Sequence, residues 1–246
     1  MDSYTYFAKY YDLLMERTDY DLWTDYVTAI FEKRKANTET ILELACGTGN
    51  IAIRLSERGY SCTGLDISES MLTLAGEKAS AKGLSIPFIL QDMGSLDYNR
   101  KTDAVLCLCD GINYITDKSE AGELFKKVSA IIRPDGVFIF DISSEYKLST
   151  VLGNNVFGEN KPEVSYIWEN FYDGKKKLIE MFLTFFGKEG ELYSKHEEVH
   201  IQRAYGTVEL EKMLRQAGFG KIEIYETLTF KEPVKESERI TFVCEL

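Results

Sequence analysis

The sequence has no long apolar run and no N-terminal targeting pattern. No stretch approaches the ~20 consecutive apolar residues that a membrane-spanning helix requires. The first residues, MDSYTYFAKYYDLL, contain acids and tyrosines where a signal peptide has basic residues followed by an apolar segment. We therefore expect a soluble, cytoplasmic protein that has no membrane partner.

Cysteine and proline are both scarce. The chain has five cysteines and four prolines. The cysteines are odd in number and form no Cys-x-x-Cys pair, so neither a disulfide framework nor a cysteine-rich zinc site is predicted. The chain has no low-complexity tract, and no linker or disordered tail is predicted. These absences favour a globular protein in a reducing compartment.

The chain also lacks the clustered basic residues that bind phosphate backbones. It has 40 acidic and 29 basic residues and a formal net charge of -11. A short basic run, Lys175 to Lys177, follows Asp173-Gly174 and is typical of a solvated turn. Nucleic acid is therefore not favoured as a partner. No pattern in the sequence predicts an oligomeric state.

Both histidines of the chain lie in one motif, His196-Glu197-Glu198-Val199-His200. It matches the zinc signature HExxH, which requires a helix that places both histidines on one face, and a third ligand. Apolar and polar residues alternate here with a period of two, which is the pattern of a strand. We therefore predict no metal site at this motif.

Short apolar runs alternate with helical segments from residue 40 onward. This order, with nearly continuous apolar strands, predicts a parallel sheet that is covered on both faces. Before it, Phe7 to Leu14 and Leu22 to Ile30 show helical spacing. The predicted strands are 40–45, 61–66, 86–91, 103–109 and 136–141, and the predicted helices between them are 49–58, 69–82 and 117–132.

Residues 155–205 have a different pattern, alternating with a period of two between turn residues. This predicts an antiparallel meander inserted after the fifth parallel strand. A helix over 207–217, with Thr207 as its N-cap, and two strands near 221–229 and 238–245 complete the chain. The fold class is thus α/β, doubly wound, with a mainly parallel sheet of seven strands and an antiparallel β insertion.

Polar residues and glycines follow the predicted strands, at the sheet edge where ligands of open α/β folds bind. Gly47-Thr48-Gly49 follows the first strand, and Gly47-x-Gly49-x-x-Ala52 matches the dinucleotide fingerprint. Three carboxylates, Glu43, Asp66 and Asp92, surround the same place. They would repel a pyrophosphate, and they suit a ligand that carries a sulfonium, an ammonium, a ribose diol and an adenine amine.

These motifs resemble those of class I S-adenosylmethionine-dependent methyltransferases. The similarity rests on ILELACGTGN at 41–50, on Asp66, on QDM at 91–93 and on DAVLCLCDGINYI at 103–115. The opening YFAKYYDLL and the meander are similar to the small-molecule branch, which includes sugar N-methyltransferases and glycine and sarcosine methyltransferases. The resemblance implies S-adenosylmethionine as cofactor and methyl transfer, by in-line displacement, to the amine or hydroxyl of a small-molecule acceptor.

The resemblance also implies domains and cofactor residues. Residues 1–36 would form a helical lid, 37–153 and 206–246 the cofactor-binding α/β domain, and 154–205 a β-rich insertion on the substrate side. The glycine loop would contact the methionine part of the cofactor, Glu43 would bind its ammonium, and Asp66 would bind the ribose. The remaining residues would contact the adenine and the amino-acid moiety or form the wall of the lid. The implied cofactor-binding residues are Tyr11, Trp23, Glu43, Ala45, Gly47, Gly49, Asp66, Ile67, Met71, Asp92, Met93 and Cys109.

No catalytic motif stands out on the acceptor side. The candidates are Asp110, Asn113, Tyr114, His200 and Arg203. The proline-rich tetrad of adenine and glutamine N-methyltransferases is absent, which disfavours DNA bases and protein amides as acceptors. Two alternatives stay open: a nicotinamide-dependent oxidoreductase, for which Tyr146-Lys147 does not supply the Tyr-x-x-x-Lys pair, and a non-catalytic module that binds the adenosyl cofactor.

Overall fold

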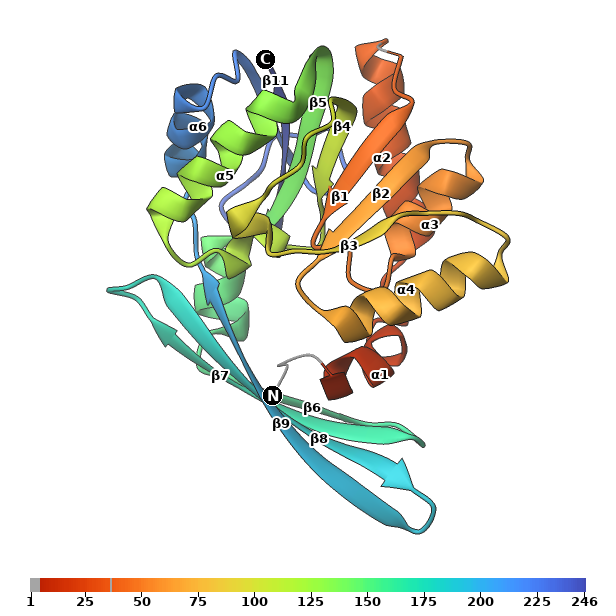
Figure 1. The fold of residues 1–246 in the computed structure, drawn as a ribbon. Helices are drawn as coiled ribbons and strands as arrows, with labels where there is room; N and C mark the ends of the chain where they lie inside the picture. Colours follow the sequence, from red (N-terminus) through yellow and green to blue (C-terminus); the bar gives the residue numbers. More distant parts are fainter. Residues whose placement is uncertain (1–4, 36) are drawn as a thin grey trace.

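The computed structural model describes residues 5–35 and 37–246, which form an α/β unit with a second, smaller sheet (Figure 1). The helices and strands are, in chain order, α1 Thr5–Leu14, α2 Tyr20–Arg34, β1 Thr40–Leu44, α3 Asn50–Glu57, β2 Ser61–Asp66, α4 Glu69–Ala81, β3 Phe88–Leu90, η1 Met93–Ser95, β4 Thr102–Cys107, η2 Gly111–Tyr114, α5 Lys118–Ile131, β5 Ile132–Ser143, η3 Lys147–Leu152, β6 Val156–Asn160, β7 Val164–Asp173, β8 Leu178–Glu189, β9 Leu192–Arg203, α6 Thr207–Gln216, β10 Lys221–Glu226 and β11 Arg239–Glu245.

The main sheet has seven strands in the order β10-β11-β5-β4-β1-β2-β3. Only β11 runs antiparallel to its neighbours β5 and β10, so the predicted mainly parallel sheet with an antiparallel edge pair is confirmed. The strand order reverses between β1 and β4, and the carboxyl ends of these strands flank a crevice of the kind that binds ligands in such sheets.

Apolar side chains bury both faces of this sheet. One core cluster joins α5 and α6 to the strands through residues such as Phe125, Phe138 and Leu210. The other joins α2 and α3 to the opposite face through Val27, Ile51 and others. Strands covered on both faces explain why the sequence reads as continuous apolar runs instead of alternating ones.

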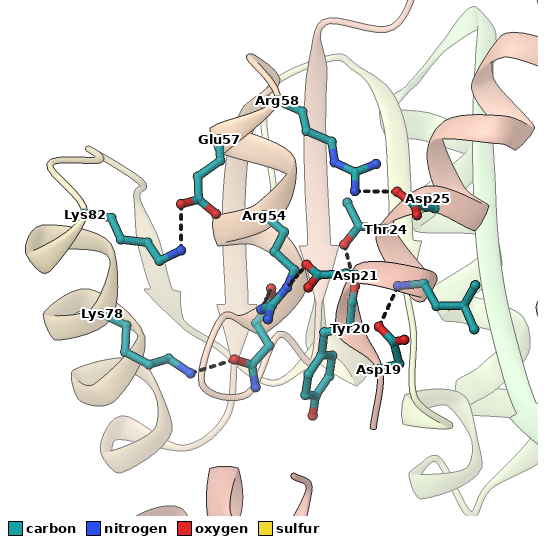
Figure 2. Close-up of polar contacts among 12 residues, drawn as sticks. Asp19, Tyr20, Asp21, Thr24, Asp25, Arg54, Glu57, Arg58, Lys78 and Lys82 are labelled. Carbon is teal, nitrogen blue, oxygen red and sulfur yellow. Dashed lines mark hydrogen bonds and ion pairs between the residues drawn. The ribbon is translucent and has the colours of Figure 1, made fainter. Parts of the chain in front are cut away.

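The two N-terminal helices have different surroundings. Helix α2 is part of the α/β core, and its outer side is tied to α3 by ion pairs from Asp21 to Arg54 (2.7 Å) and from Asp25 to Arg58 (2.5 Å) (Figure 2). Helix α1 instead lies between α4 and the second sheet (Figure 1), where the ring of Phe7 contacts that of Phe185 at 5.8 Å. The two helices of the predicted lid therefore pack against different parts of the molecule, α2 against the main sheet and α1 against the second.

The second sheet is an antiparallel meander, β6-β7-β8-β9. Strands β7, β8 and β9 coincide with the predicted alternating runs, whereas β6 and the π-helical turn η3 were not predicted. The N-cap of α6 is Gly206 and not Thr207, which is already helical. Among the described helices, the longest has 15 residues and none is long and apolar enough to cross a membrane.

Candidate active site

A cavity of about 400 Å³, here called the first cavity, lies at the carboxyl ends of β1 to β4. It contains most of the residues that the sequence assigned to the cofactor: Tyr11, Ala45, Gly47, Asp66, Ile67, Met71, Asp92, Met93 and Cys109. These residues come from α1 and from the segments after four different strands. The topology of the sheet therefore brings together residues that are up to about a hundred positions apart in the chain.

A second cavity of about 280 Å³ adjoins the first. It is enclosed by α1, the loop after β4, η3, the inner face of the meander and Arg239 of β11. Four residues, Phe7, Tyr11, Cys109 and Tyr114, line both cavities. These four side chains therefore form a wall that the two cavities share.

The glycine loop after β1 presents bare backbone to the first cavity. Ala45, Gly47 and Gly49 all have positive φ angles, of 50°, 53° and 73°. A side chain on Gly47 would meet no atom within 4 Å, so the glycine keeps the cavity wall open. Gly49 lines none of these cavities, because it packs against Ala75 and Phe88, which a Cβ atom would meet at 3.0 and 3.2 Å.

Asp66 holds this loop in place. Its Oδ2 accepts a hydrogen bond from the backbone N–H of Gly47 at 2.8 Å, and its Oδ1 accepts one from Ser68 at 2.9 Å. Burial raises the pKa of Asp66, while the backbone donors oppose that rise. Ile67 N–H is a third backbone donor to Asp66, and a carboxylate has about four acceptor sites, so a ligand hydroxyl can also donate to this side chain.

Glu43, the carboxylate inside the first strand, faces a small cavity of about 30 Å³. Tyr11, Gly47 and Cys109 line the same space. The Oε2 atom of Glu43 has no hydrogen-bond partner among the described residues, and burial raises the pKa of the carboxyl to about 8. The space accommodates a water molecule, and a nearby cation would favour the charged carboxylate.

An apolar wall lies on the other side of the first cavity. Ile67 is 60% exposed although it is large and apolar, and Met71 is buried beside it. Met93 and Asp92 line the adjoining part. Asp92 also caps η1 by accepting a hydrogen bond from Gly94 N–H at 2.9 Å. The same residue therefore both caps a turn and lines the cavity.

The two aromatic residues assigned to the lid wall are placed differently. Tyr11 lines both cavities and meets Phe7 edge to face at 5.3 Å. Trp23 lines neither cavity. It is buried on α2, where the guanidinium of Arg239 lies 5.7 Å from its ring. The structure does not bring Trp23 to the site, because α2 turns this side of the helix to the sheet.

Two of the acceptor-side candidates are used to hold the backbone. The Asn113 amide donates to the carbonyls of Ser143 (3.0 Å) and Arg203 (2.8 Å), and its oxygen accepts from Ser143 N–H (2.9 Å). The Arg203 guanidinium donates to the carbonyls of Thr116 and Lys176. Neither residue lines the second cavity, whereas Asp110, Tyr114 and His200 do.

Asp110 belongs to a charged cluster at one end of the second cavity. It forms an ion pair with Arg239 at 2.5 Å and accepts a hydrogen bond from Gln202 at 2.8 Å. Arg239 also pairs with the fully buried Asp141. The sequence did not predict Arg239, Gln202 or Lys147 as site residues. Only the folded topology brings β9 and β11 to this loop, whereas Lys147 lies just after the carboxyl end of β5 and is marked by no motif.

His200 lies on the inner face of β9, between two aromatic rings. Phe7 is 5.4 Å and Tyr114 is 6.0 Å from its ring. Its Nε2 is 3.3 Å from Glu198 Oε2, and Glu198 Oε1 accepts a hydrogen bond from the Phe7 N–H at 3.1 Å. The predicted strand at HExxH is confirmed as β9, so the helical arrangement of the zinc signature is not present here.

Comparison with known proteins identifies the family. The Methyltransferase domain family matches residues 41–136. The chain is 37% identical over 240 residues to the Bacillus subtilis protein named "Putative methyltransferase YqeM". The aligned region covers 97% of this chain and 95% of that protein. An S-adenosylmethionine-dependent methyltransferase from Clostridium acetobutylicum has 37% identity and a TM-score of 0.90, over 99% of this chain and 98% of that chain. The sugar N-methyltransferase KedS8 from Streptoalloteichus has the same fold, with a TM-score of 0.79 and 20% identity. The match covers 96% of this chain and 92% of that chain.

The sheet topology and these relatives define a class I methyltransferase fold. The chain belongs to the S-adenosylmethionine-dependent methyltransferases and is an enzyme of that class, with S-adenosylmethionine as its cofactor. The alternatives of a nicotinamide oxidoreductase and a non-catalytic module are not favoured by these similarities.

Proposed function

We propose that the enzyme methylates an amine or a hydroxyl of a small molecule held in the second cavity, with S-adenosylmethionine in the first. The observation that carries this proposal is the shared wall of Phe7, Tyr11, Cys109 and Tyr114. A donor and an acceptor on its two sides would be close enough for direct transfer, and such positioning contributes roughly 7–11 kcal/mol to lowering a barrier.

The residues of the first cavity suit the cofactor. When bound, S-adenosylmethionine supplies a methyl group that its sulfonium already makes electrophilic. Asp66 would accept hydrogen bonds from the ribose hydroxyls, and Ile67 and Met71 would pack against adenine. Gly47 would let the methionine part lie against backbone, and Glu43, with its unpartnered oxygen, would bind the ammonium through the small cavity.

The size and lining of the second cavity support a small acceptor. Its volume of about 280 Å³ is at the lower end of the range for small-molecule sites. Apolar side chains of the meander, including Met181, Leu183 and Phe185, form one wall. The meander would thus enclose the acceptor, and α1 would close over both ligands and exclude water.

His200 is the acceptor-side residue best arranged to take a proton. It lines the second cavity beside Tyr114, which lines both cavities, and its Nε2 lies 3.3 Å from Glu198 Oε2. Asp110 is less suited because Arg239 and Gln202 already occupy its oxygens. A proton acceptor is needed only where the attacking amine or hydroxyl arrives protonated.

Calorimetry and a turnover assay test the proposal. We expect S-adenosylmethionine and S-adenosylhomocysteine to bind, and NAD not to bind. With a panel of small amines and alcohols, we expect S-adenosylhomocysteine to form only when an acceptor is present. Cofactor binding without acceptor-dependent turnover across the panel would favour the non-catalytic module instead.

A further inference from the structure

The second cavity contains a lysine that the proposed transfer does not use. Lys147, the first residue of η3, lines the cavity near Asp110 and Arg239. Among the described residues, no group forms a hydrogen bond or ion pair with its ammonium; its backbone N–H is bonded to Ser144 Oγ. A half-buried ammonium without a partner is costly, because burial removes its hydration.

The electrostatics of Lys147 agree with this geometry. Burial lowers the pKa of Lys147, and the positive charge of Arg239 lowers it further. Asp110, Glu238 and Asp141 act in the opposite direction, but less strongly than burial. An anion brought close to the ammonium would therefore stabilise the charged lysine.

A second donor, on a residue of the cavity wall, also has no partner among the described residues. The indole N–H of Trp168, on β7, is buried and has no hydrogen-bond partner among the described residues. Strand β7 packs against η3, so Trp168 and Lys147 belong to adjoining elements of the cavity wall. The remaining cationic group, Arg239, is already paired with two carboxylates.

Building on the proposed function, we propose that the acceptor carries a carboxylate, which Lys147 and the indole N–H of Trp168 bind at the end of the second cavity. The body of the acceptor would be apolar, because Tyr166, Met181 and Leu183 line the space beside these donors. Its amine or hydroxyl would lie toward Tyr11 and Tyr114, where the two cavities meet.

The charges nearby favour a monoanion over a phosphate group. Asp110 and Asp141 are balanced by one arginine only, and Glu238 adds a third carboxylate that acts on Lys147. A dianion would be repelled by this surplus, and one ammonium with one indole N–H offers it few donors. A carboxylate accepts two such bonds and carries half the charge.

Binding of matched acids and amides to the full chain loaded with S-adenosylhomocysteine tests this inference. The probes are phenylacetate and phenylacetamide, 3-phenylpropanoate and its amide, and indole-3-acetate and its amide, with phenylphosphonate as the dianion. Calorimetry should show at least one acid binding about ten-fold or more tightly than its amide, because the amide cannot form the charged hydrogen bond to Lys147.

Single substitutions test whether Lys147 and Trp168 cause the preference for acids over amides. Lys147→Gln should abolish it, Trp168→Phe should reduce it about three-fold or more by removing only the N–H, and Lys147→Arg should retain it. Lys177→Gln, which changes a lysine paired with Glu145 outside the cavity, is the matched control. The inference is overturned if no pair shows an acid preference, if the preference persists in Lys147→Gln, or if phenylphosphonate binds more tightly than phenylacetate. If the wild-type protein does not bind S-adenosylhomocysteine, that result would instead count against the proposed function.

Discussion

At the residue scale, the cost of burying Glu43 points to its role. Its carboxyl lies in the core of the sheet with one oxygen unpartnered, and burial raises its pKa to about 8. Without ligand, the protonated form therefore dominates near neutral pH. An ammonium in the adjoining space would favour the charged form and lower this pKa. Cofactor binding and proton release from Glu43 are thus linked.

We predict that binding of S-adenosylmethionine at about pH 7 releases up to roughly one proton. Calorimetry in buffers of different ionisation enthalpy measures that number. 5′-Methylthioadenosine, which has no ammonium, should bind without this release, and Glu43→Gln should bind S-adenosylmethionine without it. Equal proton release by the Glu43→Gln variant would show that another group titrates.

The same carboxyl predicts a pH dependence of stability. Between its ordinary pKa of 4.5 and its folded pKa of about 8, Glu43 binds a proton in the folded state that the unfolded chain has released. The free energy of unfolding therefore falls as pH rises through this window, by roughly 2–5 kcal/mol. Denaturation of the cofactor-free protein should show a smaller fall for Glu43→Gln than for the wild type between about pH 5 and about pH 8. Parallel curves for the two proteins would contradict this assignment.

Asp66→Ala should weaken both the cofactor complex and the fold. Two backbone N–H groups, of Gly47 and Ser68, lose their acceptor, which costs roughly 1–3 kcal/mol each where they stay buried. Loss of the ribose contacts should lower the affinity for S-adenosylhomocysteine by about ten-fold or more. Calorimetry and thermal denaturation measure the two effects. Asp97→Ala, at an exposed aspartate, is the control, and an unchanged affinity in Asp66→Ala would refute the ribose role.

At the element scale, α1 is fastened to the glycine loop through one side chain. Asp12 accepts hydrogen bonds from Thr48 Oγ1 (2.7 Å), Asn50 Nδ2 (2.8 Å) and Lys78 Nζ (2.7 Å). Burial acts to raise the pKa of Asp12, but these donors outweigh it and lower the pKa overall. The helix that would cover the cofactor is therefore held by the loop that would lie beneath it.

We predict that Asp12→Asn loosens α1 while the sheet stays intact. Asparagine has one carbonyl acceptor in place of the carboxylate and loses the ion pair with Lys78. Hydrogen exchange over residues 5–14 should speed up in the variant, and S-adenosylhomocysteine should slow it in the wild type more than in the strands. Asp25→Asn, which breaks an ion pair between α2 and α3, should leave α1 unchanged. Exchange in α1 that is equally slow with and without ligand would indicate a permanently docked helix.

The elements also show which features the sequence could predict. Apolar periodicity located the five parallel strands β1 to β5 and the strands β7 to β9, because burial on one or both faces imposes that pattern. Strand β6 is mostly exposed and η3 is a single π-helical turn, so neither has a distinctive period. Trp23 was assigned to the lid wall from the family resemblance, and helical spacing alone does not distinguish a side chain facing the core from one facing a cavity.

At the scale of the whole molecule, the site depends on contacts between distant segments. Residues just after β1 to β4 were predictable as a group, because parallel strands end at the same edge. Gln202 and Arg239 were not predictable, because they reach the second cavity only through the return of the meander and the antiparallel β11. Lys147 follows the carboxyl end of the parallel strand β5, but no motif marks it as a site residue. The meander thus encloses the second cavity beside the crevice at the strand ends.

In the proposed complex, cofactor and acceptor lie on the two sides of one shared wall. A crystal structure of the complex with S-adenosylhomocysteine tests this most directly. We predict adenine beside Ile67, the ribose at Asp66, and the sulfur at the junction lined by Tyr11 and Tyr114, facing the second cavity. A sulfur atom that faces away from the second cavity, or a cofactor bound elsewhere, would contradict the account.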